Sequence, residues 1–569
     1  MNNFIWKYKN HNSAEINKIS KDFSVSNSIA TIMYLKSITN KNESRSFFYS
    51  DFKFLHDPLL MLDMDKAIDR VLLSKNNNEL ILIIGDYDAD GTTAASVLYL
   101  YFKSINIDVE YYIPNRQTEG YGVSTNAIDY AYKIGAKLII TCDCGITAIE
   151  QIEYAKQYNI ETIITDHHKQ KDELPKAFAI LNPNREDCSY PFKGLCGAGV
   201  AFKLCLGINN QLGNEMKDVL QYTDLVAIAT TADVVPIIDE NRLIVKEGLK
   251  NIIQGKNKGI RALMRVSKLD TNSINVGKLG YWFIPKINAA GRLGDAARAV
   301  KLFTTNNPQF ANEIAIDLEN ENEKRKLITM QHENDAKRII NDSIDFDKHK
   351  IIILYNDDWH FGVIGIVASR VKELYNRPTI ILTKEDGLYK GSCRSIGGYD
   401  IVNALHECSD ILENYGGHPM AAGLSIKEKY LKSFCKRMNE YTSNKLDGDL
   451  QPIINIDYEL KLSEINSRFV KFLDYLEPFG PGNAKPIFST KNIDQLSDAQ
   501  LVGKDRDTLK FTVHNGITSF NVIGFRMVEN YEKLLSDKPI DIAYYIDKNY
   551  WNNKFSTQLI LKDLVYSNE

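Results

Sequence analysis

The sequence predicts an α/β protein of several domains: a doubly wound parallel-sheet domain, a second α/β unit and a C-terminal β-barrel. Its 569 residues exceed what one ordinary hydrophobic core organises, so about two to four domains are expected. Apolar, β-branched runs alternate with helix-like segments from about residue 51 to residue 445. Beyond residue 452, short strand-like runs alternate with turns, which suits a small barrel.

The predicted elements can be placed in order along the chain. Residues 1–50 are polar and rich in Asn, Ser and Lys, which indicates a helical N-terminal extension. We assign residues 51–304 to the doubly wound domain. The charged, glycine-free segment 308–341 predicts one long connecting helix within 305–345, with Pro308 near its start. A new strand at 350–355 opens the second α/β unit, 346–445.

A polar segment, SNKLDGDLQP at 443–452, marks the next boundary. We assign residues 452–569 to the barrel. Its predicted strands are 452–456, 507–514, 518–524, 540–546 and 555–561.

Acidic residues and histidines follow three strand-like runs in the first domain. The runs at 80–84, 138–141 and 162–165 precede GDYDADG, CDCG and TDHH, and a fourth cluster stands in ADVVP. Such runs are typical of buried parallel strands, whose carboxyl ends gather distant side chains into one crevice. We therefore expect the following side chains to converge: Asp86, Asp88, Asp90, Asp143, Asp166, His167, His168 and Asp233.

Carboxylates crowded in one crevice raise each other's pKa, so cations must neutralise them near neutral pH. Mixed carboxylate and imidazole ligands suit Mn²⁺ and tolerate Mg²⁺, whereas a closed structural zinc site would more often use thiolates. Two divalent ions about 3.5–4 Å apart can activate a water and stabilise the leaving oxygen of a phosphodiester. The cluster therefore predicts metal-assisted hydrolysis.

The first cluster also has simpler interpretations. Asp86-x-Asp88-x-Asp90-Gly91 matches the opening half of an EF-hand, but Val97 stands where the bidentate glutamate belongs, and a strand rather than a helix precedes it. Residues 90–93 also predict a turn and N-cap for a helix over 94–102, which is compatible with metal binding. The glycine-rich segment 197–199 predicts a helix entry that needs small residues for close packing, rather than a phosphate cradle.

The segments GDYDADGTTA, CDCGIT, TDHH and ATTADVVP, in this order, resemble the four motifs of the DHH phosphoesterase superfamily. Later segments resemble one branch of it, the bacterial RecJ family of single-strand-specific exonucleases: INAAGRLGDA (287–296), WHFGVIGIVASR (359–370), GSCRS (391–395), GGHPMAAG (416–423) and LEPFGPGN (476–483). The match runs from about residue 50 to near the C-terminus.

This resemblance implies a 5′→3′ exonuclease on single-stranded DNA that uses two Mn²⁺ or Mg²⁺ ions, releases 5′-mononucleotides and acts in DNA recombination and repair. It also implies that the second α/β unit is a DHH-associated domain of the DHHA1 type and that the barrel is an OB-fold.

The resemblance further implies roles for individual residues. The implied metal ligands are Asp86, Asp88, Asp90, Asp143, His167, His168 and Asp233. Which of the first three bind metal directly stays open, since one can act from outside the ligand shell. The implied catalytic residues are Asp88, Asp143, His167, His168, Asn288, Arg292 and His418.

Three of these residues lie outside the acidic motifs. Asn288 and Arg292 stand four apart after Pro285, so a helical turn would put them on one face, where the resemblance has them bind substrate phosphate. Gly416 to Pro419 predict a flexible turn that presents the imidazole of His418. In that position it would contact the scissile phosphate or assist proton transfer.

Ser392 and Arg394 stand two apart in GSCRS, so on an extended strand both would project from the same face. An arginine fork beside a hydroxyl is well suited to a terminal phosphate. By resemblance, Arg116 of PNRQTEGYG joins them to form the pocket that holds the 5′-phosphate.

An OB barrel binds single strands by stacking bases on aromatic rings and by holding phosphates with basic side chains. The candidates in the last domain are Phe511, Phe520, Phe525, Tyr550, Trp551, Lys504, Arg506 and Lys510. For any single aromatic residue among them, a place in the barrel core is the more common outcome.

Composition limits the classes of protein to consider. The formal net charge of −4 gives no global attraction to phosphate, so a nucleic-acid partner must rely on local basic clusters. No apolar run approaches the roughly 18–20 residues needed to cross a bilayer, and the start of the sequence lacks a signal-peptide core, so we expect a cytoplasmic protein. The eight cysteines form no CxxC pair, which predicts reduced and mostly buried thiols.

The family likeness leads us to expect single-stranded DNA as the substrate, a single-strand-binding protein and a RecQ-type helicase as partners, no membrane, and a monomer. Two other functions stay open. A DHH phosphodiesterase acting on oligoribonucleotides, cyclic dinucleotides or pyrophosphate would share the metal motifs but would not need the barrel or GSCRS. A non-catalytic DNA-binding scaffold would have lost the ligands, all of which are present here.

Overall fold

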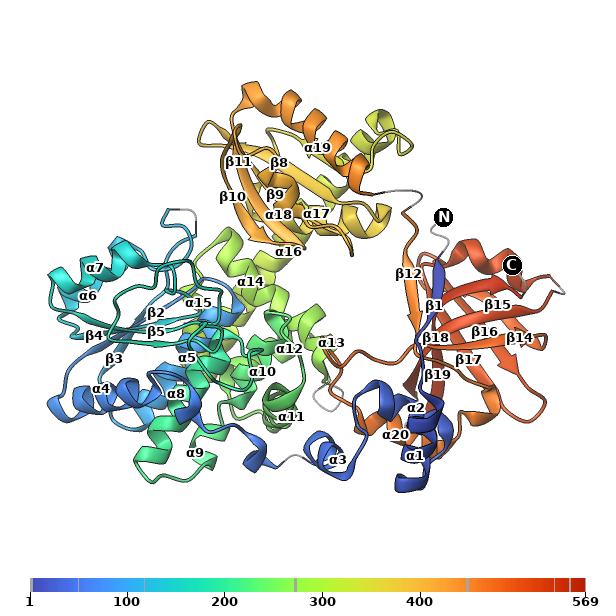
Figure 1. The fold of residues 1–569 in the computed structure, drawn as a ribbon, viewed down its shortest axis with the longest axis horizontal. Helices are drawn as coiled ribbons and strands as arrows, with labels where there is room; N and C mark the ends of the chain where they lie inside the picture. The colour runs from blue at the N-terminus through green and yellow to red at the C-terminus, as the bar shows by residue number, and fades with distance from the viewer. Residues whose placement is uncertain are drawn as a thin grey trace.

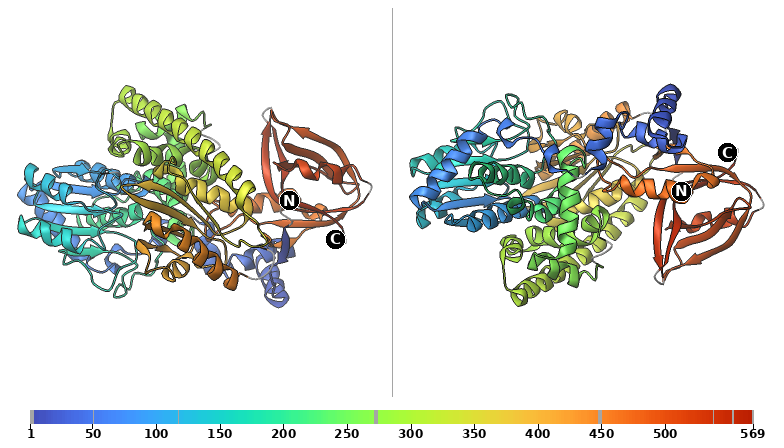
Figure 2. Two further views of the ribbon diagram at one scale, coloured as in Figure 1. Left: turned by 90° about the horizontal axis from the view of Figure 1, so that it is seen from above. Right: turned by 90° about the horizontal axis from the view of Figure 1, so that it is seen from below.

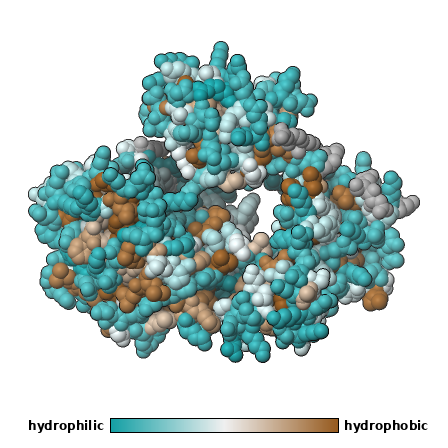
Figure 3. Space-filling model, viewed as in Figure 1, coloured by the Kyte–Doolittle hydropathy of each residue, from teal (hydrophilic) through white to brown (hydrophobic). Residues whose placement is uncertain are grey.

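The computed structural model describes residues 4–49, 51–116, 118–270, 274–446, 450–536, 538–551 and 554–567. Three bodies surround a central opening: the first α/β unit, the second α/β unit above it and a C-terminal β-sheet beside them (Figure 1). In the space-filling view the opening passes through the molecule (Figure 3).

The first α/β unit is built on a five-stranded parallel sheet in the order β3-β2-β4-β5-β6. Its strands are β2 (Ile81–Gly85), β3 (Val109–Tyr112), β4 (Leu138–Cys142), β5 (Glu161–Thr165) and β6 (Ala179–Leu181). The three predicted runs are therefore strands, and nearly all of their residues are buried. Helices α4 (Met64–Asn77), α5 (Ala89–Ser104) and α8 (Gly197–Gln211) cover one face, and α6 (Thr125–Ile134) and α7 (Ile149–Gln157) cover the other. The sheet is doubly wound, as predicted.

A helical layer follows this sheet and ends in one long helix. Its elements are α9 (Lys217–Leu220), α10 (Thr223–Ala232), α11 (Asp239–Gln254), α12 (Lys258–Val266), α13 (Val276–Lys278), the π-helical turn η4 (Leu279–Phe283), α14 (Ile284–Leu293), α15 (Ala297–Thr304) and α16 (Pro308–Ser343). The long helix agrees with the predicted 308–341, and Asn307 caps it. It contacts α12 and α14 and then α17 (Phe361–Tyr375), so it connects the two α/β units. None of the described helices is both long and apolar enough to cross a membrane.

The second α/β unit has a five-stranded mixed sheet in the order β10-β11-β9-β8-β7. Its elements are β7 (Ile352–Tyr355), α17, β8 (Thr379–Glu385), β9 (Leu388–Arg394), α18 (Ile401–His406), β10 (Leu412–His418), β11 (Ala421–Ile426) and α19 (Leu431–Lys445). The strand predicted at 350–355 is confirmed.

The flexible turn predicted at 416–419 is wrong, because Gly416, Gly417 and His418 form the end of strand β10. Gly417 has φ of 140°, and a Cβ there would lie 2.5 Å from the Ala421 carbonyl oxygen on the neighbouring strand β11. The glycine is therefore needed for close pairing of two strands, not for a turn.

The C-terminal sheet has seven strands in the order β13-β14-β18-β19-β17-β16-β15. They are β13 (Tyr458–Glu459), β14 (Phe488–Ile493), β15 (Leu496–Val502), β16 (Thr508–His514), β17 (Ser519–Phe525), β18 (Ile540–Trp551) and β19 (Lys554–Tyr566), with helices α20 (Ser467–Tyr475) and α21 (Tyr531–Leu534) beside them. Four of the five predicted strands lie in this sheet. The sequence prediction missed β14 and β15, and no residue of β15 is fully buried, so that strand carries no clear apolar alternation.

Single 3₁₀ turns lie between several elements: η1 (Phe52–Phe54), η2 (Pro58–Leu60), η5 (Glu428–Tyr430), η6 (Leu462–Glu464) and η7 (Val528–Asn530).

The N-terminal segment lies against the C-terminal sheet. It contains β1 (Ile5–Tyr8), α1 (Ser13–Phe23), α2 (Asn27–Leu35) and α3 (Lys41–Phe48), so the predicted helical character is confirmed. Buried residues such as Ile19 and Ile32 share one hydrophobic core with Phe469 and Phe488 of the C-terminal part. Figures 1 and 2 show this blue segment beside the red sheet, far along the chain from it. Residues 4–49 are therefore an integral part of that body rather than an extension.

The strand predicted at 452–456 forms, but it is not part of the seven-stranded sheet. It is β12 (Ile453–Ile456), which pairs in parallel with β1 as a separate two-stranded ribbon, with Ile5 opposite Ile453. Ile454 and Ile456 are buried against Trp6 of β1 and Ala543 of the sheet. Their apolar faces are thus covered by the N-terminus, which the sequence pattern of β12 alone does not reveal.

Arg242 of α11 joins the first α/β unit to the other body. It is 3% exposed and donates hydrogen bonds to the backbone carbonyls of Leu476 at 2.9 Å and Glu477 at 2.7 Å. It also donates to the carbonyl of Phe47 at the end of α3, at 3.2 Å. Burial lowers the pKa of Arg242 to about 10, so it stays charged at neutral pH.

We predict that Arg242→Ala lowers the free energy of unfolding by about 3 kcal/mol, because it removes a buried charge and the hydrogen bonds that it donates to the carbonyls of Phe47 and Glu477. Urea unfolding followed by fluorescence measures this loss. The matched control is Arg265→Ala, an exposed arginine of α12, which should change stability by less than about 0.5 kcal/mol. Equal stability of the two variants would contradict the role of Arg242 as the junction.

Candidate active site

The acidic motifs meet where the strand order of the first sheet reverses. The chain leaves β2 toward β3 on one side and returns to β4 on the other, so the ends of β2 and β4 flank the switch point. Asp86 follows β2 directly, and Asp143 follows β4. Crevices at such points are the usual ligand sites of open α/β sheets.

The first turn of α5 carries two of the acids. Asp88 is the N-cap, and its Oδ1 accepts hydrogen bonds from the backbone N–H groups of Asp90 at 2.8 Å and Gly91 at 3.1 Å. The helix predicted over 94–102 therefore begins earlier, at Ala89, and its cap lies upstream of the predicted one. Asp90 accepts from the N–H groups of Gly197 at 2.6 Å and Ala198 at 2.8 Å. The start of α8 thus holds the Asp90 carboxylate in place.

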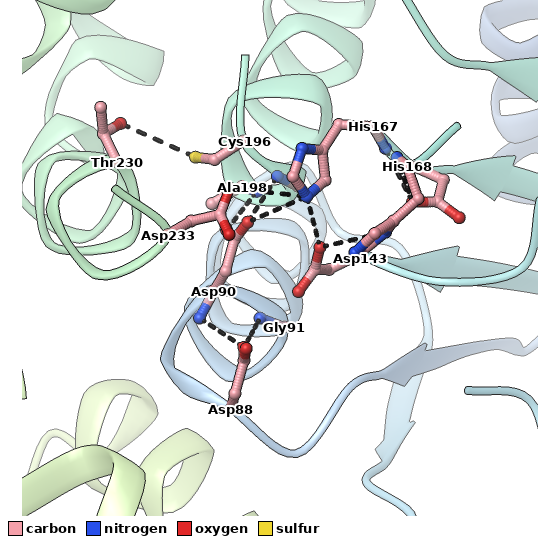
Figure 4. A network of polar contacts seen from close by, with 12 residues as sticks. Asp88, Asp90, Gly91, Asp143, His167, His168, Cys196, Ala198, Thr230 and Asp233 are labelled. Atoms are coloured by element: carbon pink, nitrogen blue, oxygen red, sulfur yellow. Dashed lines mark hydrogen bonds and ion pairs between the residues drawn. The ribbon is translucent and has the colours of Figure 1, made fainter. Parts of the chain in front are cut away.

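His167 lies at the centre of the acidic cluster (Figure 4). Its Nε2 is 3.0 Å from Asp143 Oδ1, 3.6 Å from Asp233 Oδ2 and 3.9 Å from Asp90 Oδ2. Asp233 comes from the end of α10, far from His167 in the sequence. The structure therefore brings all four acidic motifs together, as the sequence predicted.

Three buried atoms of this cluster lack a hydrogen-bond partner within the described part of the chain: Asp86 Oδ1, Asp143 Oδ1 and His167 Nε2. Asp143 Oδ1 and His167 Nε2 lie close together, yet no hydrogen bond satisfies either. Buried polar atoms without partners are costly, and a bound cation would satisfy carboxylate and imidazole lone pairs at once. The residues present therefore fit a metal centre.

Within the described part of the chain, three groups of side chains offer ligand atoms within 4.8 Å of one another: Asp143, His167 and His168; Asp90, His167 and Asp233; Asp86, Asp88 and Asp143. Asp143 and His167 each belong to two groups, which is the pattern expected for neighbouring ions that share ligands. Carboxylate and imidazole donors suit Mn²⁺ and, less specifically, Mg²⁺.

Burial and mutual repulsion hold protons on these carboxyls when no cation is bound. Burial and the charge of Asp88 raise the pKa of Asp86 to about 8 and that of Asp90 to about 7. Burial and the charge of Asp90 raise the pKa of Asp233 to about 8, and the same causes raise that of Asp143 well above its usual range. Burial and the charge of His168 lower the pKa of His167 to about 4, so this ring is neutral and can bind metal.

Asp166 is a residue of the TDHH motif for which the sequence analysis predicted no separate role. It is buried, and its Oδ1 lies 2.7 Å from His168 Nδ1, while its Oδ2 accepts from the N–H of Ile146 at 2.9 Å. Although burial opposes a charged ring, the hydrogen bond to Asp166 raises the pKa of His168 to about 9. A carboxylate behind a metal-binding histidine fixes the orientation of the ring, so Asp166 is a positioning residue for His168.

The backbone at the site is strained at two points. Asp143 has φ of 60° and Val234, next to Asp233, has φ of 58°, which is unusual for a β-branched residue. A Cβ on Gly197 would lie 2.5 Å from the Cβ of Asp143, which explains the small residue at the entry of α8. The predicted need for close packing at 197–199 is thereby confirmed. Such strain persists where the surrounding structure enforces a functional geometry.

Asn288 and Arg292 lie on α14, one turn apart as predicted. Asn288 Oδ1 accepts a hydrogen bond from the N–H of Ala89 at 2.9 Å, so it touches the start of the acidic helix α5. Arg292 donates to the carbonyl of Gly362, at the start of α17, at 3.0 Å. The α14 helix thus bridges the acidic cluster and the second α/β unit.

Several arginines gather where the two α/β units meet. Burial and the charges of Arg116, Arg325 and Arg394 lower the pKa of Arg292 to about 10. The guanidinium of Arg116 lies over the rings of Tyr87 and Phe361, at 5.1 and 5.9 Å. No ion pair with a described carboxylate is found for Arg116, Arg292 or Arg394. Asp88 lies near enough to act on the pKa of Arg292, but cations grouped without an ion pair suit an anion.

Ser392 and Arg394 lie on β9, and Arg394 Nη1 donates to Ser392 Oγ at 3.0 Å. The extended strand and the shared face are therefore as predicted. Arg394 Nε donates to Ser369 Oγ of α17 at 3.0 Å, which fixes the orientation of the guanidinium group. A Cβ on Gly365 of that helix would lie 3.1 Å from Arg394 Nη2, so the glycine leaves the guanidinium its space.

His418 ends β10 and is exposed. His418 is the smallest of the causes that act on the pKa of His167, after burial, His168 and Asp166.

The basic and aromatic candidates of the C-terminal sheet differ in how far their side chains are exposed. Phe511 and Phe520 are buried in the core, so they offer no surface to a ligand. Phe525 is 63% exposed, Lys504 and Arg506 are exposed, and Lys510 is half-buried. Tyr550 and Trp551 belong to β18, but their side chains lie outside the described structure.

We predict that Mn²⁺ binds the metal-free protein more tightly as pH rises from 6 to about 8. Carboxyls such as Asp86 and Asp233, with pKa values of about 8, must release protons before they bind the ion. Titration calorimetry at pH 6, 7 and 8 in buffers of different ionisation enthalpy measures both the affinity and the protons released. An affinity independent of pH over this range would contradict the raised pKa values.

The comparisons with known proteins agree with this geometry. The description "DHH family, N-terminal domain" matches residues 80–230, "DHHA1 domain" matches residues 348–444 and "RecJ OB domain" matches residues 456–563. The chain is 33% identical to the single-stranded-DNA-specific exonuclease RecJ of Bacillus subtilis over 99% of its own length and 71% of that protein. It is 32% identical to the Haemophilus influenzae protein of the same name over 90% of this chain and 92% of that one.

A solved structure shows the same fold. The crystal structure of RecJ from Thermus thermophilus in complex with Mn²⁺ superposes with a TM-score of 0.84 at 25% identity, covering 99% of this chain and 80% of that one. The fold is thus a DHH domain, a DHHA1 domain, a connecting helix and an OB domain. With nearly full-length similarity, three matching domains and the clustered motifs, the chain belongs to the RecJ family of the DHH phosphoesterases.

Proposed function

We propose that this protein is a 5′→3′ exonuclease specific for single-stranded DNA, which depends on Mn²⁺ or Mg²⁺ and releases 5′-mononucleotides in DNA recombination and repair. The relatives named single-stranded-DNA-specific exonucleases support the substrate and the reaction. The observation that carries the proposal is the nearness of an acidic cluster that can hold metal to a group of arginines without an ion pair among the described residues, since Asp88 of the cluster acts on the pKa of Arg292.

The metal ligands in this proposal are the residues of the acidic cluster: Asp86, Asp88, Asp90, Asp143, His167, His168 and Asp233. When bound, two divalent ions supply an activated water and stabilise the leaving oxygen of the phosphodiester. Asp166 keeps His168 oriented, and the amides at the start of α8 keep Asp90 oriented. Little reorganisation is then needed when substrate binds.

Asn288, Arg292 and His418 act on the scissile phosphate. Arg292 offers a charged donor beside the acidic helix, and Asn288 fixes the backbone between Asp88 and Asp90 through its hydrogen bond to Ala89. His418, presented by the second unit, contacts the phosphate or donates a proton to the leaving oxygen. Part of the catalytic set therefore comes from each α/β unit.

Arg116, Ser392 and Arg394 hold the 5′-phosphate of the strand. The fork of Arg394 is held by Ser369 and Ser392, so its geometry is fixed before a phosphate arrives. A pocket for the terminal phosphate at a set distance from the metals sets the direction of digestion and the size of the product. Single-strand selectivity follows if the passage between the two units admits only an unpaired strand.

The remaining parts of the proposal follow from family likeness. We assign 51–304 to the DHH domain, 305–345 to the connecting helix, 346–445 to the DHHA1 domain and 452–569 to the OB domain, whose exposed Phe525, Lys504 and Arg506 contact the strand. A single-strand-binding protein and a RecQ-type helicase are the proposed partners. The proposed location is the cytoplasm and the proposed state is a monomer.

The function is tested with a single-stranded oligonucleotide labelled at either end, digested with Mn²⁺ beside a diribonucleotide and a blunt duplex. We expect mononucleotides from the 5′ end of the single strand alone, and a loss of at least about a thousandfold in Asp143→Ala and His168→Ala. Preference for the diribonucleotide would assign the protein to a small-substrate phosphodiesterase. Strand binding without hydrolysis in any metal would assign it to a scaffold.

We predict that Arg394→Ala slows digestion of a 5′-phosphorylated strand by about 10- to 100-fold but leaves a 5′-hydroxyl strand nearly unchanged, because only the former loses a charge-assisted bond. The measurement is kcat/KM on both substrates. Arg437→Ala is the matched control, since Arg437 is a half-buried arginine of the same unit paired with Asp410. An equal loss on both substrates would contradict a role in 5′-phosphate recognition.

A further inference from the structure

His360 caps the start of helix α17 and keeps one nitrogen of its ring free. Its Nδ1 accepts a hydrogen bond from the N–H of Gly362 at 3.0 Å. Because a backbone N–H can only donate, Nδ1 carries no proton, and the neutral ring carries its proton on Nε2. No residue in the described part of the chain is hydrogen-bonded to Nε2, and the half-buried ring leaves this atom open to solvent. His360 Nε2 is therefore an available hydrogen-bond donor.

The ring of His360 is held in place by neighbouring helices. The N–H of His360 donates to Nε2 of His332 on α16 at 2.9 Å. A Cβ on Gly362 would lie 3.0 Å from Cε1 of the His360 ring and 2.9 Å from the carbonyl oxygen of Arg292 on α14. The start of α17 is thus packed closely between α14 and α16. The orientation of the donor is fixed before any ligand arrives, which lowers the cost of binding one.

His360 lines a cavity of about 470 Å³ between the two α/β units, together with Arg116 and Arg292. Two acidic residues, at positions 385 and 386, also line this cavity, but each accepts a hydrogen bond from Lys390 at 2.8 Å. Two guanidinium groups without an ion pair to a described carboxylate and one free imidazole N–H therefore border the same space. Such a set of donors suits an anion.

The cavity adjoins the residues proposed to hold the 5′-phosphate. Gly362 and Gly365 stand three apart on α17, so they share one face of the helix. A Cβ on Gly365 would lie 3.0 Å from Ser392 Oγ and 3.1 Å from Arg394 Nη2. The helix face that packs against the His360 ring therefore continues, within one turn, to Ser392 and Arg394.

We propose that His360 is a further residue of the 5′-phosphate pocket and that its Nε2 donates a hydrogen bond to the terminal phosphate. This inference rests on the proposed function. A terminal phosphate offers three strong acceptor oxygens, more than one arginine fork engages. A 5′-hydroxyl end offers none of them, so a fixed donor at this point favours the phosphorylated end.

Capping and donation make different demands on the side chain of His360. Asparagine is a good N-cap residue, so His360→Asn keeps an acceptor for the N–H of Gly362 but removes the Nε2 donor. His360→Ala removes both. His406→Asn is the matched control, because His406 is an exposed histidine of α18 in the same unit, with its Nδ1 2.6 Å from the hydroxyl of Tyr415 rather than at the cavity.

The experiment compares two thymidine decamers, one with a 5′-phosphate and one with a 5′-hydroxyl. Their affinities are measured by fluorescence anisotropy in EDTA, where turnover is stopped, and kcat/KM is measured for both with Mn²⁺. The ratio between the two strands reports recognition of the phosphate, and the melting temperature of each variant reports the helix cap.

We expect the preference for the 5′-phosphate to fall about tenfold in both His360→Asn and His360→Ala, because each loses one charge-assisted hydrogen bond. Binding of the 5′-hydroxyl strand should not change, and the melting temperature should fall only in His360→Ala. His406→Asn should match the wild type. An unchanged preference in His360→Asn would overturn the proposal, and a loss confined to His360→Ala would overturn it in favour of a capping role. An equal loss on both strands in His360→Asn would also contradict it.

Failure of the underlying function gives a different result. If the wild type digests neither strand, the exonuclease assignment fails, and the affinities in EDTA still decide whether His360 recognises the 5′ end. If the wild type digests single strands but does not distinguish the two ends, the assignment stands and the proposal for His360 is overturned. A wild type that neither binds nor digests either strand would overturn both.

Discussion

The crowding of buried carboxylates at the switch point of the first sheet is the constraint on which the rest of this structure depends. Burial and repulsion raise the pKa of Asp86, Asp90, Asp143 and Asp233, and the charge of His168 offsets this only in part. The fold can bury these carboxylates because backbone amides and strained loops hold them in place, and because bound cations can neutralise their charge. Because burying these carboxylates without cations costs free energy, the cluster is organised to bind metal ions.

The second α/β unit supplies charge of the opposite sign. Ser392 and Arg394 lie on β9 and His418 lies on β10, while Arg116 and Arg292 of the first unit contact Phe361 and Gly362 at the start of α17. In the proposed function, the acids hold cations and the nearby arginines hold phosphate, which suits a substrate that carries a phosphate at each end of one nucleoside. The proposed polarity of the reaction therefore depends on the two units, which are held together mainly by α16 and α14.

The N-terminal segment and the C-terminal sheet form the third side of the ring. Ile19 and Ile32 enter the core of the sheet, β1 covers β12, and Arg242 ties both to the first unit through backbone carbonyls. The central opening is therefore bounded by segments from both ends of the chain (Figure 1).

The sequence by itself determined the local structure and the chemistry. Buried β-branched runs that alternate with helical segments favour parallel strands, and acids placed directly after neighbouring parallel strands meet at one edge of the sheet. Only the tertiary structure decided which elements become neighbours. The pairing of β12 with β1, the burial of Phe511, the placement of Gly417 in a strand and the position of Tyr121 between His168 and Tyr87 all depend on contacts between distant segments. Short-range patterns carry no information about such contacts, because packing partners far apart in the chain select them.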